Sequence, residues 1–212
     1  MSGKKTKYKD LFEGIRKVPL KSIKGTFYRI TAKDHKILDD SGSIRGSGGR
    51  YNNSKGYRAL YLGENINLCK SEIKKQAKEL LIKTEGFRPF SLGEVEISLV
   101  NVLDLTDENI LNYLKIKRED LIKSNYTFTQ KIGEIAHNIN IEALKVPSIT
   151  NKGNNLVVFK ENVGRKSYIK LKEKRKIKIT LFQSLLKGQK MDDLIKKTTE
   201  LGIDEIIPVL TL

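Results

Sequence analysis

The chain has 212 residues, and its 41 basic and 25 acidic residues give a formal net charge of +16 at pH 7. This length is enough for one sizeable hydrophobic core, so a single domain with an appendage is expected. The single cysteine, Cys69, excludes a disulfide framework within the chain and a cysteine-rich zinc site. No segment approaches the ~18 apolar residues needed to cross a bilayer, which predicts a cytoplasmic protein without membrane segments.

The excess of basic residues favours anionic partners, because a positive surface raises the local concentration of phosphate groups. Nucleic acid is one candidate partner. The alternative is a lysine-rich composition in which the lysines occupy solvated faces and have no partner. Net charge does not separate these interpretations, so the partner has to be inferred from the motifs.

The first 20 residues are predicted to form a basic extension, with residues 4–9 frayed because they are charged and terminal. Residues 26–31 are typical of a core strand, with aromatic and β-branched side chains. Arg29 lies inside this strand, where burial of its guanidinium is costly without a partner. Arg29 therefore either faces solvent or contacts a ligand.

Residues 43–72 are the stretch around which the chain is organised. Four glycines between positions 42 and 49 give a backbone that can take positive φ and approach a ligand closely. Arg50 follows the glycines, and the short apolar run around Tyr61 is typical of a buried strand. Asn65 is predicted to cap a helix that continues to about residue 84 and carries Glu72 at the edge of its apolar stripe. Arg50, Tyr61 and Glu72 therefore lie on a loop, a strand end and a helix that can converge on one cleft.

The next segments alternate between strand and helix patterns. Residues 94–105 alternate apolar and polar side chains, as expected of a long strand. Thr106 is predicted to cap a helix over residues 107–115. Residues 126–138 have the apolar spacing of a core helix, which ends near a structural histidine, His137.

Three further features complete the predicted domain. A short strand at residues 143–146 ends at Pro147, which leaves Ser148 in a turn. A glycine- and asparagine-rich loop then precedes a buried strand at residues 156–159. Lysines occupy positions 170, 172, 174, 176 and 178, and on a strand these would share one face. We expect an edge strand whose lysines discourage edge-to-edge pairing and attract anions.

The order and spacing of these motifs resemble those of the RES-domain family, which is named for an arginine, a glutamate and a serine. The resemblance covers roughly residues 25 to 180. It rests on Gly48-Gly49-Arg50-Tyr51-Asn52, Gly56, Tyr61-Leu62, Glu72, Pro147-Ser148 and Asn155-Leu156. The family more often has tryptophan where this chain has Tyr51, so an aromatic side chain is kept.

The resemblance implies an α+β fold with ADP-ribosyltransferase-like mixed sheets and peripheral helices. It also implies a toxin that cleaves NAD at the nicotinamide–ribose bond, with phosphate or water as acceptor. No cofactor is implied beyond NAD as the substrate and inorganic phosphate as a co-substrate. The implied partner is an Xre-type DNA-binding antitoxin, with nucleic acid contacted only through the antitoxin complex.

The resemblance also implies roles for individual residues. Glu72 would stabilise positive charge on the ribose, Arg50 would bind the NAD phosphates or an acceptor phosphate, and Tyr61 would stack on or orient the nicotinamide ribose. Ser148 would donate a hydrogen bond near the phosphates. Further substrate contacts are expected from Tyr28, Arg29, Tyr51 and Asn52.

Two other functions remain open from the residues themselves. The same cleft would support transfer of ADP-ribose to a protein target. A basic nucleic-acid-binding module without catalysis would instead use the lysines at 170–178 and the C-terminal segment.

The C-terminal residues, 181–212, do not continue the RES pattern and resemble the opening segment of the RsmE-type ribosomal RNA uridine methyltransferases. A helix is predicted from about residue 191 to 201, followed by Gly202 and a strand at 205–210. The pieces of that family that bind S-adenosylmethionine lie further downstream. We therefore expect three parts, an extension at 1–20, a RES domain at 21–180 and an appended fragment at 181–212 without methyltransferase activity.

Overall fold

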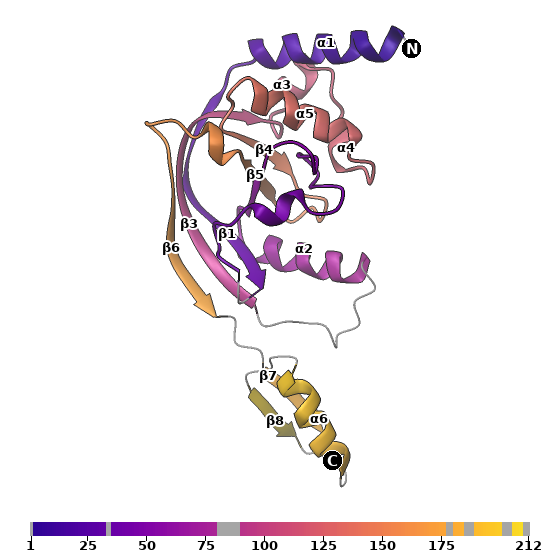
Figure 1. Cartoon of the computed structure of the whole chain (residues 1–212), viewed down its shortest axis with the longest axis vertical. Coiled ribbons are helices and arrows are strands. Elements are labelled where there is room, and N and C mark those ends of the chain that lie inside the picture. The colour runs from indigo at the N-terminus through magenta and orange to yellow at the C-terminus, as the bar shows by residue number, and fades with distance from the viewer. Residues whose placement is uncertain are drawn as a thin grey trace.

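The computed structural model describes residues 2–32, 35–79, 90–176, 180–184, 189–200 and 205–209. In chain order, its helices and strands are α1 (Ser2–Lys17), β1 (Lys21–Ala32), β2 (Leu60–Gly63), α2 (Ile66–Glu79), β3 (Phe90–Asp104), α3 (Glu108–Tyr113), α4 (Arg118–Ile122), α5 (Thr127–Asn138), β4 (Ala143–Pro147), β5 (Asn154–Val158), β6 (Tyr168–Lys176), β7 (Thr180–Ser184), α6 (Gln189–Glu200) and β8 (Glu205–Val209). A mixed sheet with helices around it confirms the predicted α+β class (Figure 1). Within these ranges, no helix is long and apolar enough to cross a membrane.

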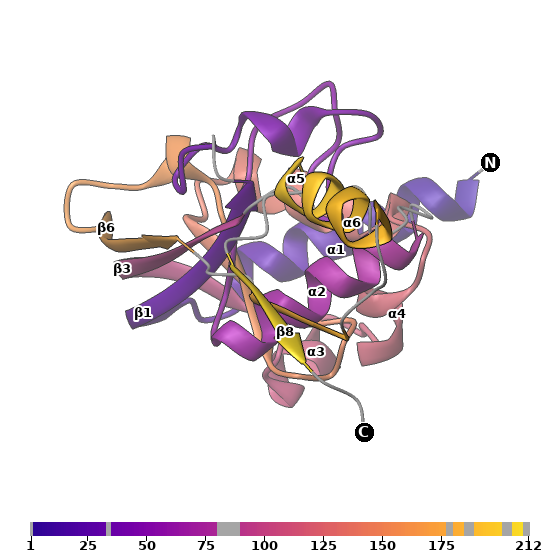
Figure 2. The ribbon, with the colours of Figure 1, turned by 90° about the horizontal axis from the view of Figure 1, so that it is seen from below.

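The long strand β3 organises the main sheet, whose strand order is β1-β2-β5-β4-β3-β6. Residues 91–98 of β3 pair with β1 on one edge and β6 on the other, and residues 102–104 pair in parallel with β4. β1, β3 and β6 lie side by side in Figures 1 and 2. A further pair, Tyr28 with Gly63, joins β1 to β2, so five of the strands close into a ring. This closure brings Tyr28 next to β2, the strand that carries Tyr61.

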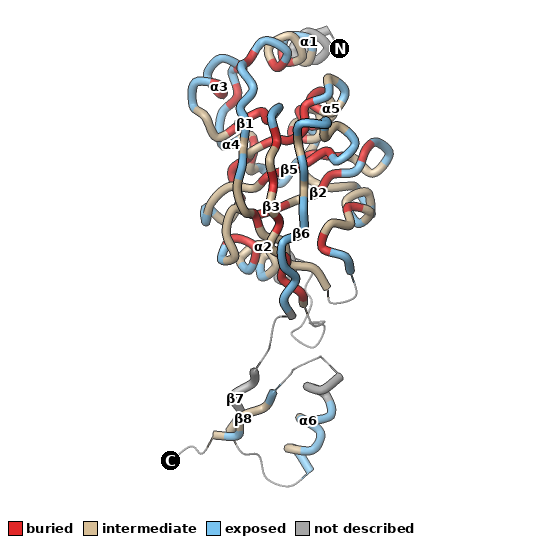
Figure 3. Tube along the Cα trace, turned by 90° about the vertical axis from the view of Figure 1, so that its left-hand side faces the viewer, coloured by how far each residue is buried: buried red, intermediate tan, exposed pale blue. Residues whose placement is uncertain are grey.

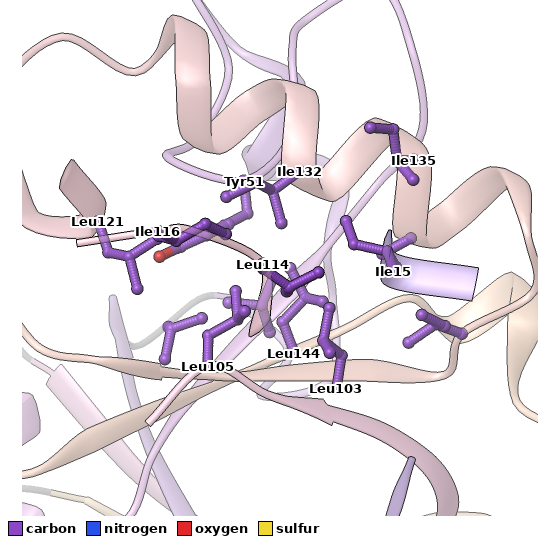
Figure 4. Close-up of a cluster of buried hydrophobic side chains, with 14 of the residues drawn as sticks. Ile15, Tyr51, Leu103, Leu105, Leu114, Ile116, Leu121, Ile132, Ile135 and Leu144 are labelled. Atoms are coloured by element: carbon purple, nitrogen blue, oxygen red, sulfur yellow. The ribbon is translucent and has the colours of Figure 1, made fainter. Parts of the chain in front are cut away.

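Two clusters of buried apolar side chains hold the helices and strands together. The larger cluster joins α1, α3 and α5 to β3, β4 and β5 (Figure 4), and includes Leu11, Ile15, Leu103, Leu105, Ile110, Leu111, Ile132, Ile135, Leu144 and Val157. The smaller cluster joins β1, β2, β3 and β5 through Phe27, Leu60, Val95, Ile97 and Leu156. Each fully buried side chain of this kind stabilises the fold by about 1.5–3 kcal/mol. The clusters therefore give a rigid frame from which the connecting loops project.

The N-terminal segment differs from its prediction. Residues 4–9 were expected to fray, but they lie within α1, whose later turns bury Leu11 and Ile15. These side chains are four residues apart and belong to the larger cluster, so packing stabilises a helix whose charged start gives no such signal.

The cap of α3 also differs from its prediction. Asp107 is the N-cap residue, and its carboxylate accepts a hydrogen bond from the Asn109 amide at 2.9 Å. Thr106, the predicted cap, instead donates its hydroxyl to Asp104. Both residue types are good caps, so the competing partner at Asp104 decides between them.

The lysine strand β6 is an exposed edge strand of the described sheet, as predicted (Figure 3). Its lysines, however, do not share one face. Lys170 pairs with Glu96 and Lys174 pairs with Gly93, while the register shifts between Glu94 and Val95. Residues paired across strands share a face, and positions 93 and 96 lie on opposite faces of β3. This bulge therefore separates Lys170 from Lys174, and the predicted continuous basic face is wrong. Lys178 lies outside the described residues.

The C-terminal residues form a β–α–β arrangement of their own. β7 and β8 pair in parallel from Thr180 with Glu205 to Ser184 with Val209, and α6 connects them in sequence. In Figure 1 these elements lie apart from the main sheet. The predicted helix and the predicted strand are confirmed over the described residues, whereas Gly202 and residue 210 lie outside them.

Candidate functional site

Two adjoining cavities lie at β2 and α2, the larger one bounded by the glycine-rich loop and the smaller one by β1. The larger has a volume of about 550 Å³ and the smaller about 190 Å³. Both are lined by Tyr61, Glu72 and Asn155, so these three residues stand at their junction. Arg50 also lines the larger cavity, which brings together the three residues that the sequence placed on a loop, a strand and a helix.

The Glu72 carboxylate is fixed by two hydrogen bonds to the same oxygen. Oε1 accepts from the Ser148 hydroxyl at 2.8 Å and from the Asn155 side-chain amide at 2.6 Å. Ser148 is buried, and its hydroxyl oxygen also accepts from the Thr150 amide at 3.1 Å. Within the described part of the chain, no hydrogen bond reaches Oε2. The Glu72 carboxylate therefore lines both cavities in an orientation that the hydrogen bonds to Oε1 fix.

The Ser148 geometry revises the role expected of that residue. Its hydroxyl was expected near the substrate phosphates, but it is committed to Glu72 and Thr150, and Ser148 lines neither cavity. The sequence indicates Asn155 only as part of a strand motif, yet it contacts Glu72 and lines both cavities. The signal for Asn155 was available, because a polar residue at the start of a buried strand needs a partner.

Arg50 is held from three sides. Its Nη1 donates to the backbone carbonyls of Leu121 and Lys123, and its guanidinium lies 4.4 Å from the centre of the Tyr126 ring. These partners follow Arg50 by more than 70 residues. Because one guanidinium nitrogen is anchored, the planar group has a fixed direction at the cavity wall, which suits bidentate binding of an anion.

The glycine-rich loop is shaped by close contacts at Gly48 and Gly49. Gly48 has φ of +84°, and a Cβ there would collide with the backbone of Asn52. A Cβ on Gly49 would lie 2.5 Å from the Tyr61 hydroxyl oxygen. Glycine is therefore required at both positions for the loop to fold back against β2.

A residue that the sequence did not single out, Gln130 of α5, closes this loop from the other side. Its side-chain amide donates to the carbonyls of Ser47 at 3.1 Å, Gly49 at 3.0 Å and Asn52 at 3.4 Å. The loop that carries Arg50 is thereby bound to the helix that follows Tyr126.

Tyr61 and Asn52 support the loop through two hydrogen bonds that meet at the Tyr61 hydroxyl. The Tyr61 hydroxyl accepts from the Tyr51 amide and donates to Asn52 Oδ1, both at 2.9 Å. Burial raises the pKa of Tyr61, so it remains a neutral phenol. The expected substrate contact from Asn52 is not supported, because Asn52 is fully buried and its amide donates to the carbonyls of Ser43 and Tyr57.

Tyr51 lies mainly in the core rather than presenting an open aromatic platform. It is 1% exposed, belongs to the larger apolar cluster, and lies among Ile116, Leu121 and Ile132 in Figure 4. Tyr51 also contributes to the wall of the larger cavity. Burial raises the pKa of its hydroxyl, so the side chain stays neutral. An aromatic side chain is therefore needed here for packing.

The two residues predicted on β1, Tyr28 and Arg29, line the smaller cavity. The Arg29 guanidinium donates to the carbonyls of Ile37 and Asp39, both at 2.6 Å. Burial lowers the pKa of Arg29, and nearby Asp39 and Asp40 partly oppose that shift. Arg29 is therefore not a solvated strand residue. Its Nη1 is anchored on backbone carbonyls, as is that of Arg50, and its predicted contact with the substrate stays a prediction.

The wall of the larger cavity is cationic. Arg45, Arg50 and Lys75 line it with one carboxylate, Glu72, which gives a net charge of +2 among these four side chains. Such a cavity favours a ligand with several negative charges. In the described residues, no group of histidine, cysteine, aspartate and glutamate side chains is arranged to hold a metal ion.

Comparison with known proteins gives matches to two family models and to named relatives. The RES domain family model matches residues 26–177, and a model for an RNA methyltransferase domain matches residues 172–212. A protein named NAD(+) phosphorylase MbcT, from Mycobacterium bovis and Mycobacterium tuberculosis, is 22% identical over 162 residues. That alignment covers 76% of this chain and 86% of the relative.

A second relative and a solved structure extend the comparison. A probable NAD(+) phosphorylase from Mycobacterium tuberculosis is 28% identical over 154 residues, which cover 70% of this chain and 71% of that protein. The crystal structure of the M. tuberculosis MbcT–MbcA toxin–antitoxin complex contains a chain with the same fold, with a TM-score of 0.69 and 23% identity. The match covers 79% of this chain and 92% of the other. The family model spans well over half of the sequence and includes Arg50, Glu72 and Ser148, and the chain belongs to the RES-domain family.

Proposed function

We propose that this protein cleaves NAD at the bond between nicotinamide and ribose. The observation that carries the proposal is the Glu72 carboxylate, which is held by Ser148 and Asn155 at the junction of two cavities, one of them cationic. The names of the relatives support NAD as the substrate, because both are described as NAD(+) phosphorylases.

The chemistry requires stabilisation of charge on the ribose. As the glycosidic bond breaks, its electron pair goes to the positively charged pyridinium nitrogen, and nicotinamide leaves as a neutral molecule. The leaving group therefore needs no proton from a general acid. Positive charge develops on the ribose, where a fixed carboxylate stabilises it more in the transition state than in the ground state. Glu72 supplies that carboxylate.

The surrounding residues bind and orient the substrate. Arg50, directed by its backbone anchors, contacts the diphosphate of NAD. Tyr61 presents its ring at the junction of the cavities while its hydroxyl supports the loop. Ser148 and Asn155 act on Glu72, and Asn155 also lines the space that the substrate occupies.

The acceptor in this proposal is inorganic phosphate. An oxygen of phosphate forms the new bond to the anomeric carbon, which gives ADP-ribose phosphorylated at that carbon together with nicotinamide. The net charge of +2 around the larger cavity supports an anionic acceptor over water, and the named activity of the relatives agrees. The reaction uses NAD as substrate and phosphate as co-substrate, and it requires no other cofactor.

Incubation of the purified protein with NAD, in the presence and absence of phosphate, tests this function. We expect release of nicotinamide that depends on phosphate and is reduced by orders of magnitude in Glu72→Gln. Glu108→Gln, at an exposed position on α3, is the matched control and should behave as the unmodified protein. Intact NAD after prolonged incubation of the folded protein would contradict the proposal.

We further propose that the protein acts as the toxin of a toxin–antitoxin pair. A protein that consumes the NAD of its own cell must be held inactive, and a solved structure with this fold is a toxin–antitoxin complex. The cationic cavity suits a partner that inserts an acidic or carboxylate-ended segment in competition with the NAD phosphates. Expression alone should stop growth as NAD falls, and co-expression of the neighbouring gene should restore it. Harmless expression of an active enzyme would refute the toxin role and leave the chemistry in place.

A further inference from the structure

The positive charges of the larger cavity come from two different elements. Arg45 and Arg50 belong to the glycine-rich loop, whereas Lys75 belongs to α2. Lys75 follows Glu72 by three residues on this helix, and side chains at that spacing share a face with about 5–6 Å between their Cβ atoms. The helix therefore presents a cation directly beside the carboxylate that faces the reacting ribose.

The proposed reaction needs two anions in the site at once. The diphosphate of NAD carries two negative charges, which the two loop arginines balance. An incoming phosphate then has to approach Glu72, and the like charges repel one another. A cation next to Glu72 offsets this repulsion at the place where phosphate has to attack.

We infer that Lys75 binds the acceptor phosphate and thereby determines that phosphate, rather than water, attacks the ribose. This inference rests on the proposed NAD cleavage. A lysine suits the role because its ammonium group is a point charge on a flexible stem that can follow a phosphate during the reaction. Lys75 is half-buried at the cavity wall, which reduces the screening of its charge by solvent.

The neighbouring lysine on α2 provides a matched control. Lys74 is exposed and lines a separate depression with Asn65, Lys70 and Lys152, and it does not line the larger cavity. Replacing either lysine by methionine removes one positive charge from the same helix. The side-chain length and the helix propensity at that position stay similar. A difference between the two variants therefore reports on position rather than on net charge.

The experiment measures the rate of NAD cleavage against phosphate concentration, together with the ratio of phosphorylated ADP-ribose to ADP-ribose. For Lys75→Met we expect the KM for phosphate to rise roughly 10- to 100-fold, the effect of losing one charge-assisted hydrogen bond. The KM for NAD should change little, and the product should shift towards ADP-ribose. Lys75→Arg should retain part of the phosphate dependence, and Lys74→Met should match the unmodified protein.

Two outcomes separate this inference from the proposed function. If the unmodified protein leaves NAD intact, the proposed function fails. If it cleaves NAD but Lys75→Met keeps the phosphate KM and product ratio of Lys74→Met, the role of Lys75 alone is refuted. Should Lys75→Met fail to fold, Lys75→Gln carries the same test with a polar side chain of similar size.

Discussion

Ser148 donates its hydroxyl hydrogen to Glu72 at 2.8 Å across 76 residues of sequence. The bond joins the turn after β4 to the middle of α2. Asn155 of the neighbouring strand β5 donates a second hydrogen bond to the same Glu72 oxygen. The carboxylate is therefore preorganised by one donor in the turn after β4 and one donor on β5. Preorganised charge is more effective in catalysis than charge that has to reorient during the reaction.

Removing either donor should reduce turnover more than substrate binding. We expect Ser148→Ala and Asn155→Ala each to lower kcat about 10- to 100-fold, because Glu72 loses one hydrogen bond that fixes its position. The double variant should lose less than the product of the two effects, since both donors act on one oxygen. Steady-state kinetics with NAD measure this, and additive losses would show that the two residues act independently.

Arg50 is predicted to matter through its directed guanidinium as well as its charge. Arg50→Ala should lower kcat/KM for NAD by at least about 100-fold, as expected for loss of charge-assisted hydrogen bonds. Arg50→Lys should recover little, because lysine cannot both anchor to the carbonyls of Leu121 and Lys123 and bind a diphosphate. Arg118→Ala, at an exposed site on α4, is the control. Activity of Arg50→Lys close to that of the unmodified protein would reduce the role of Arg50 to charge.

Gln130 is expected to position the loop that carries Arg50. Gln130→Leu removes three hydrogen bonds to loop carbonyls and should destabilise the protein by about 1–3 kcal/mol. The KM for NAD should rise, because the loop then samples other conformations. Denaturant unfolding and kinetics measure the two effects, and an unchanged KM in a destabilised variant would limit Gln130 to a structural role.

Glu142 should make stability sensitive to acid. Burial raises the pKa of Glu142, but hydrogen bonds from Gly164, Ser167, Asn101 and Val100 outweigh burial and lower it below its usual 4.5. A lowered folded-state pKa stabilises the protein above the unfolded pKa, and this stabilisation is lost as the pH falls through the folded value. Unfolding measured from pH 6 downwards should show this loss below about 4.5.

The variant Glu142→Gln provides the comparison for that experiment. It should be less stable near neutral pH, since a neutral amide replaces a carboxylate that accepts four hydrogen bonds. Its stability should also change less than that of the unmodified protein as the solution is acidified. Parallel acid profiles for the two proteins would show that other carboxylates control acid unfolding.

The C-terminal β–α–β arrangement should be dispensable for NAD cleavage. None of the residues that line the two cavities lies beyond Asn155, and β7 and β8 pair only with each other among the described strands. A chain that ends at residue 178 should therefore retain nearly full turnover. Aggregation or loss of activity of this shorter protein would show that residues 179–212 support the main domain.

Local features of the sequence were sufficient for the outline of the site. The glycines at 48 and 49 predict a loop with unusual backbone freedom, and Gly48 does take a positive φ. Asn65 caps α2 through a 2.8 Å hydrogen bond from the Leu68 amide, as its position predicts. Such signals depend on residues close in sequence, and so does the formation of a loop, a strand or a helix. The same kind of signal therefore placed Arg50, Tyr61 and Glu72 on the correct elements.

The tertiary structure decided what each polar side chain contacts. Asn52 and Ser148 carry groups that suit a ligand, yet both are buried and form hydrogen bonds to other protein groups. Asn155 and Gln130, by contrast, have roles that the local sequence does not reveal. A loop sequence states which groups are available and not which way they face. For Gln130 with the glycine-rich loop and for Asn155 with Glu72, that direction is fixed by hydrogen bonds between segments more than 70 residues apart. The bulge that divides the lysines of β6 has the same origin, because pairing with β3, rather than the lysine spacing, sets the face of each residue.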